Sequence, residues 1–138
     1  MSESYATPAR AIFARGNWPL AVVDTVVVVA VMLAGELQHR IDPVANPLRV
    51  ADTLLPFLVG WIVFAGVSGL YARTDRQLGA DLRLLIVAWF AGASVGLTLR
   101  SSPYFHGGVS WPFGVVVTGT VLVVLVAWRV AHAGITRE

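Results

Sequence analysis

The chain has 138 residues, which gives room for one domain; 57% of them are hydrophobic and only 13% are charged. Soluble domains carry about 25% charged residues, and a soluble chain this small would expose apolar surface to water and aggregate. The net charge of +2 includes no basic run that could grip a phosphate backbone, so no nucleic-acid partner is expected. The absence of cysteine excludes disulfides, thiolate metal sites and cysteine nucleophiles. This composition favours a protein embedded in a lipid bilayer.

Four apolar segments are each long enough to cross a hydrocarbon core of roughly 30 Å as a helix of about 20 residues. They are residues 18–37, 53–72, 82–99 and 112–132, and we expect Pro56 to lie in the first turn of the second. None shows the polar alternation of a strand, and the first is too long for the apolar region of a signal peptide. We predict an all-α polytopic membrane protein. Its four-transmembrane-helix bundle covers residues 18–132, between an N-terminal segment (1–17) and a C-terminal tail (133–138).

All ten basic residues are arginines, and their positions predict an orientation. Seven fall on the side of the termini: Arg10, Arg15, Arg73, Arg76, Arg83, Arg129 and Arg137. Three fall on the opposite side: Arg40, Arg49 and Arg100. By the positive-inside rule both termini lie in the cytoplasm, N-in and C-in, and the protein is expected in the cell (inner) membrane as a multi-pass protein.

Asp24 interrupts the valine-rich first segment, six residues from its start and about 9 Å along the helix. A charge at the centre of a membrane helix costs roughly 2.5–3.5 kcal/mol, and less near the edge, unless it pairs, is protonated or meets water. Arg129 reaches a similar depth in the fourth segment. We expect the two to form an intramembrane ion pair, which either pins the two helices together or belongs to a pathway through the bundle.

Small residues at helical spacing predict where helices approach closely. These candidates for helix packing are Gly35, Gly60, Gly92 and Gly96. The Gly92-x-x-x-Gly96 spacing is the most specific of them, because both glycines fall on one face.

Polar residues collect at the end of the bundle away from the termini: Glu36, His39, Asp42, Asp52, Arg100 and His106. Arg100 either reaches the aqueous interface unaided or attracts an anion and pairs with Glu36 in an external vestibule. Histidine titrates near neutral pH, so His39 and His106 are candidates for a pH-sensitive gate.

No other chemistry is favoured, and no cofactor or metal is expected. Haem would need two facing histidines deep in the bundle, and zinc could draw only on Glu36, His39, Asp52 and His106. The stretch GVSGLY (66–71) lacks the strand–turn–helix context of a hydrolase nucleophile. No catalytic residue is assigned, and we do not expect an enzyme.

Several short motifs are spread over residues 18–131: Asp24, Gly35 and His39, Pro56-Phe57, Gly60-Trp61, Gly69-x-Tyr71, Trp89, Arg100, Gly107-Gly108 and Trp128-Arg129. Together they resemble a family of small prokaryotic four-helix integral membrane proteins that is known only as a domain of unknown function. The resemblance implies a fold and a membrane location, and it implies no activity. The chain lacks the glutamate-centred first helix of small multidrug transporters and the Gly-Ala-x-x-Arg signature of dual-topology fluoride channels.

Two functions follow as hypotheses. The first is a channel or transporter-like conduit for an ion or small solute, assembled as a homo-oligomer, with Asp24 and Arg129 at an inner gate and Arg100 as outer selector. The second is a non-catalytic membrane module that binds a protein partner, a lipid or a hydrophobic cofactor through its small-residue faces.

Overall fold

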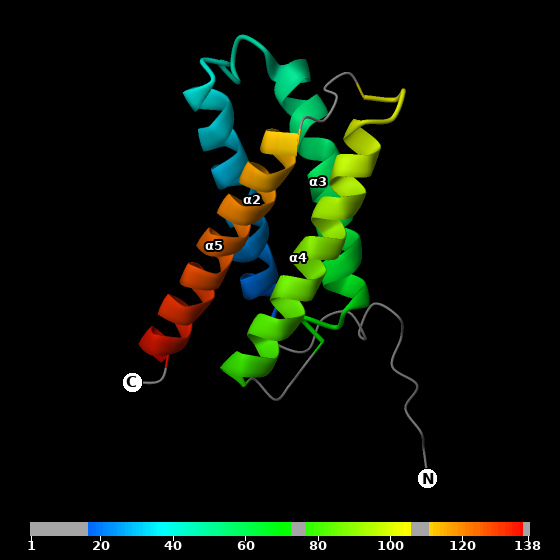
Figure 1. The fold of residues 1–138 in the computed structure, drawn as a ribbon. Helices are drawn as coiled ribbons and strands as arrows, with labels where there is room; N and C mark the ends of the chain where they lie inside the picture. Colours follow the sequence, from blue (N-terminus) through cyan, green and yellow to red (C-terminus); the bar gives the residue numbers. More distant parts are fainter. Residues whose placement is uncertain (1–16, 73–76, 106–110, 137–138) are drawn as a thin grey trace.

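Four long helices form the protein in a computed structural model, which describes residues 17–72, 77–105 and 111–136 (Figure 1). They are α2 (Trp18–Gln38), α3 (Pro47–Val67), α4 (Leu78–Arg100) and α5 (Trp111–Thr136). All four are long and apolar enough to cross a membrane, and the described residues contain no strand. The predicted all-α, four-helix membrane fold is confirmed. The N-in, C-in orientation stays a prediction.

The start of α2 and the end of α5 lie at the same end of the bundle, called here the termini end (Figure 1). The opposite end carries the connection between α2 and α3, and is called here the loop end. Many large apolar side chains on the outside of the helices are exposed, including Val26 at 58% and Val123 at 67%. Surfaces of this kind suit hydrocarbon and would drive aggregation in water.

The second helix is displaced from its expected bounds of 53–72. Pro47 starts α3 six residues earlier, because a proline in the first turn forfeits no helical hydrogen bond. Pro56 therefore lies inside the helix, and its expected place in the first turn is wrong. The helix ends at Val67, because Gly69 takes a left-handed φ of 75° that continues no helix. Residues 68–72 then form turns, which carry Tyr71 back towards the bundle.

Close contact between α3 and α4 is the tightest packing in the bundle. A methyl group added at Gly60 would overlap the backbone carbonyl of Gly92, and one added at Gly96 would lie 2.8 Å from the ring of Phe57. Glycines here let two backbones approach directly, as the sequence predicts. Gly35 is the exception: nothing lies within 4 Å of an added methyl group. Its assignment to helix packing is wrong, because α5 does not approach α2 at this level.

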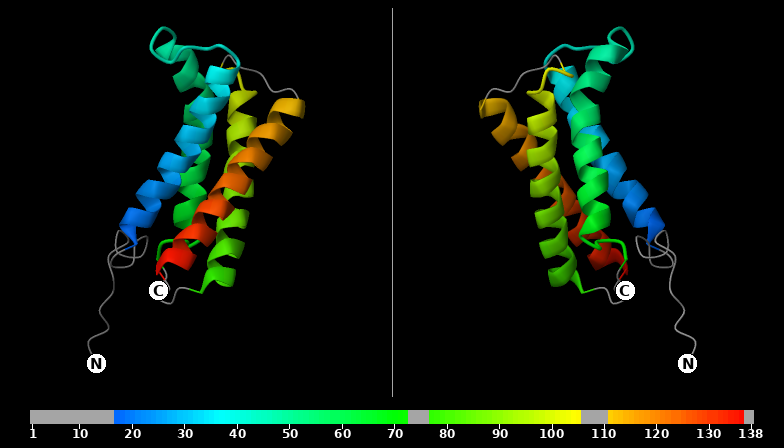
Figure 2. Two further views of the ribbon diagram at one scale, coloured as in Figure 1. Left: turned by 90° about the vertical axis from the view of Figure 1, so that its left-hand side faces the viewer. Right: turned by 90° about the vertical axis from the view of Figure 1, so that its right-hand side faces the viewer.

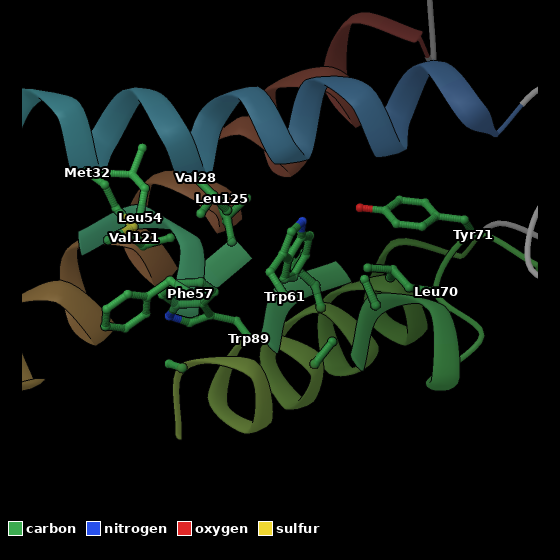
Figure 3. Close-up of a cluster of buried hydrophobic side chains, with 14 of the residues drawn as sticks. Val28, Met32, Leu54, Phe57, Trp61, Leu70, Tyr71, Trp89, Val121 and Leu125 are labelled. Carbon is green, nitrogen blue, oxygen red and sulfur yellow. The ribbon is translucent and has the colours of Figure 1, made fainter. Parts of the chain in front are cut away.

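Aromatic side chains fill the centre of the bundle (Figure 3). Phe57 and Trp89 stack with ring centroids 6.5 Å apart, and Trp61 lies 6.2 Å from Trp89. The indole N–H groups donate to polar atoms, Trp61 to Thr25 Oγ1 at 3.2 Å and Trp89 to the carbonyl of Thr118 at 2.8 Å. This core holds α3 and α4 together as the support on which α2 and α5 are placed.

Candidate functional site

The carboxylate of Asp24 lies in the bundle with no exposed surface. Arg129 Nη2 donates to Oδ2 at 2.6 Å, and Arg129 Nε donates to both oxygens at 3.1 and 3.2 Å. The indole of Trp128 donates to Oδ1 at 2.9 Å, and the hydroxyl of Tyr71 donates to Oδ2 at 2.6 Å. Asp24 thus has charge-assisted hydrogen bonds from three side chains, the arrangement that makes a buried carboxylate tolerable.

Arg129 has a second acidic neighbour. Its Nη1 lies 3.8 Å from Oδ2 of Asp81, which is buried in the first turn of α4. The guanidinium is also 5.9 Å from the centre of the Tyr71 ring. Arg129 therefore links α2 and α4 from its position on α5, and one cation lies between two carboxylates.

Tyr71 reaches Asp24 from the turn after α3. Asn17, just before α2, fixes this turn by donating its side-chain amide to the carbonyl of Tyr71 at 2.9 Å. Burial, followed by the negative charge of Asp24, raises the pKa of the Tyr71 phenol above its ordinary value. The hydroxyl therefore stays protonated at neutral pH and acts as a donor to the carboxylate.

One helical turn towards the loop end, the inner faces of α2 and α5 carry apolar side chains. Val28 follows Asp24 by four residues on α2, and Leu125 precedes Arg129 by four residues on α5, so both lie on the inner faces of their helices. Val28, Leu125 and Val121 have no exposed surface. Figure 3 shows Val28 beside Leu125, and Val121 beside Leu54, one turn of α5 nearer the loop end. We call these three residues the apolar layer.

A groove opens between α2 and α5 towards the loop end, and Val121 of the apolar layer forms part of its wall. Its volume is about 780 Å³, and on α5 it extends from the level of Val124 towards the loop end. Figure 2 shows why it exists: α5 is inclined across the bundle, so that its start stands away from the end of α2. The residues that line the groove on α2 and α5 are mostly apolar, whereas its loop end is polar.

The polar loop end of the groove contains three of the residues singled out in the sequence: Glu36, His39 and Arg100. Glu36 is buried on α2, His39 caps that helix and is exposed, and Arg100 ends α4 with its guanidinium 4.5 Å from the centre of the Phe113 ring. Asp52 is half-buried on α3 and acts electrostatically on Arg100, although it does not line the groove. His106 lies outside the described residues.

The structure thus brings together Asp24 and Arg129, the two residues that the sequence pairs, and it gathers Glu36, His39 and Arg100 around one groove. Among the residues described, no three histidine, aspartate or glutamate side chains gather as a metal site would need. Sequence reasoning missed the roles of Tyr71, Trp128 and Asp81 as neighbours of the pair. The glycine two residues before Tyr71 is the signal that could have placed it in a turn, since a left-handed glycine ends helices.

Four membrane-spanning helices around a buried ion pair define this chain as a small multi-pass membrane protein. Residues 21–132 match the family described as "Protein of unknown function (DUF3054)", and the chain belongs to that family. It is also similar to a curated protein of Pyrobaculum aerophilum named "K(+)-insensitive pyrophosphate-energized proton pump", with 31% identity over 111 residues and 73% of the chain covered. The chain spans 14% of the length of that protein. No solved structure matches.

Proposed function

We propose that this protein is a channel or transporter-like conduit for an ion or small solute in the cell (inner) membrane, and that the proton is the species to test first. One observation carries the proposal. A polar-ended groove and a buried charged pair both lie between α2 and α5. Val121 is in the wall of the groove, and the fully buried side chains of Val28 and Leu125 lie one helical turn from the charged pair. Ionisable residues inside membrane spans mark ion and proton pathways, and apolar constrictions gate such pathways by excluding water.

The apolar segment that would close the proposed pathway is short. Val28 and Leu125 each stand one helical turn from the ion pair, about 6 Å along the axis. If water entered the bundle at this turn, it would connect the groove to Asp24. A proton that binds the Asp24 carboxylate neutralises it, weakens its bond to Arg129, and can leave towards the termini end, which we expect to face the cytoplasm. No covalent chemistry is involved, so we propose a non-enzymatic protein.

The likeness to a protein named as a proton pump supports the choice of ion. The small size of the bundle favours a path at the α2/α5 seam over a central pore, and a homo-oligomer remains our prediction for the assembled state. The groove is also large for an ion, since pockets of about 300–1,000 Å³ hold drug-sized molecules. This favours a second candidate, a binding module for a hydrophobic ligand.

Proton flux into liposomes tests the conduit. The protein is reconstituted in zwitterionic phosphatidylcholine vesicles that contain a pH-sensitive dye, and a pH step is applied. Val28→Thr keeps the volume of the side chain and adds a hydroxyl to the apolar layer, so we expect flux about ten-fold above wild type. Val26→Thr is the matched control, because Val26 is on the same helix with its side chain exposed on the outside.

Adding Asp24→Asn to the Val28→Thr variant distinguishes proton transfer through the Asp24 carboxylate from nonspecific proton leakage. If protons pass by way of the carboxylate, this second change returns the flux to the wild-type level. Flux that persists without Asp24 removes Asp24 from the path. Equal flux through Val28→Thr, Val26→Thr and empty vesicles contradicts the conduit itself.

A further inference from the structure

We propose that the groove between α2 and α5 binds one acyl chain of an anionic phospholipid, with the phosphate of its headgroup at Arg49 and Arg100. Both arginines line the loop end of the groove. Binding itself does not depend on the proposed conduit. Its consequence does, because a lipid chain in the groove occupies the space through which water would approach the apolar layer.

The shape of the groove suits a single chain. On α5 its lining runs from Pro112 to Val124, about 18 Å of helix, and the side chains on this wall are mainly valines. The opposite wall on α2 includes Val31, Ala34 and Gly35. Both walls are mainly apolar, and they lead from the polar loop end towards the middle of the bundle.

The headgroup decides which lipid binds. Acyl chains are as apolar as the groove walls, so a chain gains little by leaving the bilayer for the groove. Within the lining of the loop end, Arg49 and Arg100 exceed Glu36 by one positive charge when His39 is neutral, and Asp52 offsets part of this charge from outside the lining. Guanidinium groups hold phosphate through paired hydrogen bonds. An acidic headgroup therefore complements this end better than a neutral one.

The position of Arg100 matches the depth of a headgroup. It is the last residue of α4, at the end of a predicted membrane span, and the Phe113 ring 4.5 Å away orients its guanidinium. Arg49 is exposed in the first turn of α3 and also lines the groove. A phosphate at the membrane interface would meet both side chains while its chain lay along α5.

Gly35 provides a way to close the groove without changing its charges. Nothing lies within 4 Å of a side chain begun at this position, so Gly35→Leu would project into the open space. Gly119 on α5 is the matched control: it also has nothing within 4 Å, it is exposed, and it does not line the groove.

Photolabelling in nanodiscs tests the proposal on the full-length protein. Phosphatidylglycerol or phosphatidylcholine that carries a diazirine in one acyl chain is added as a trace, and labelled peptides are identified by mass spectrometry. We expect phosphatidylglycerol to label the groove walls of α2 and α5 about ten-fold more than phosphatidylcholine does. Gly35→Leu should abolish this labelling, and Gly119→Leu should leave it unchanged.

Arg100→Gln keeps the test valid if Gly35→Leu does not fold. It should remove most of the preference for phosphatidylglycerol and leave labelling by phosphatidylcholine unaltered. Equal labelling by the two lipids in the wild type overturns the proposal, as does unchanged labelling in Gly35→Leu. Oxidative cross-linking of Val116→Cys into a dimer would assign the groove to a second copy of the chain and overturn it too.

The consequence for flux is measured separately. In Val28→Thr vesicles, replacing part of the phosphatidylcholine by phosphatidylglycerol should lower proton flux, and Arg100→Gln should reduce this inhibition. Labelling without any flux would leave the lipid site intact and refute only the conduit, whereas flux without lipid preference would refute the lipid site alone.

Discussion

Arg129 binds both oxygens of the Asp24 carboxylate, with Nη2 2.6 Å from Oδ2 and Nε 3.1 Å from Oδ1. The two residues are 105 positions apart, on the last and the first helix of the bundle. Helices α2 and α5 diverge towards the loop end, and the groove opens between them there (Figure 2). The pair therefore joins α2 and α5 where they approach, and it leaves the other half of their seam open.

Removing either partner should destabilise the protein strongly. Asp24→Asn or Arg129→Gln leaves the other charge buried, which costs about 3–5 kcal/mol. The double variant should lose clearly less than the sum of the two single losses, because neither member of the pair then stays buried without the other. Unfolding in mixed micelles measures these free energies.

The control is Arg83→Gln, which changes an exposed arginine on α4 and should alter stability by less than about 0.5 kcal/mol. Strictly additive losses would contradict the coupling.

Tyr71→Phe should lower the free energy of unfolding by about 1.5–3 kcal/mol at pH 7, because a hydrogen bond to a charged acceptor is lost. Tyr104→Phe is the control, since Tyr104 is 84% exposed. The difference between wild type and Tyr71→Phe should also depend on pH. The Tyr71 pKa is raised in the folded protein above its unfolded value of about 10.

The direction in which stability changes with pH follows from the difference in Tyr71 pKa between the folded and unfolded states. Above a pH of about 10 the unfolded chain releases the phenolic proton while the folded protein keeps it, so stability falls as pH rises. The advantage of wild type over Tyr71→Phe should be constant from pH 7 to 9 and shrink above pH 10, towards the raised pKa. An advantage that already declines between pH 7 and 9 would argue against a protonated donor to Asp24.

Gly60→Ala should separate α3 from α4. The added methyl group meets the carbonyl of Gly92, which is backbone and cannot turn aside, so we expect a loss of about 2 kcal/mol or more. Gly119→Ala has open space around it and should be neutral or stabilising by up to about 1 kcal/mol, through helix propensity alone. Equal effects of the two substitutions in the same unfolding assay would show that the close contact is not needed.

Physical reasons decide which features the sequence could predict. Hydropathy predicts four helices, because a continuous apolar run of about 20 residues in lipid can satisfy its own backbone groups only as a helix. Helical rise predicts that Asp24 and Arg129 share a depth. The Asp24 neighbours Tyr71 and Trp128 were not foreseen, because their directions depend on the end of α3 and on the tilt of α5. Gly35 was misassigned for the same reason: spacing locates a small residue on a face, and only the path of the neighbouring helix determines whether that face is covered.

The predicted orientation can be tested because the chain has no cysteine of its own. Val44→Cys lies in the exposed connection between α2 and α3, and Ile135→Cys lies exposed near the end of α5. In intact bacterial cells a membrane-impermeant thiol reagent should label Val44→Cys and leave Ile135→Cys unlabelled until the cells are lysed. The reverse pattern would invert the topology, and labelling of both would indicate a mixed insertion.

Water accessibility along α2 tests most directly whether the groove ends at an apolar layer above Asp24. Single cysteines at Val31, Val28 and Val26 are placed in phosphatidylcholine vesicles and exposed to a polar thiol reagent, which reacts only with a hydrated thiolate. We expect Val31→Cys to react from the loop end, Val28→Cys in the apolar layer to stay unreactive, and lipid-facing Val26→Cys to stay unreactive as well. If Val28→Cys reacts as fast as Val31→Cys, no apolar layer separates the groove from the ion pair. If Val31→Cys is as unreactive as Val26→Cys, water does not enter the groove.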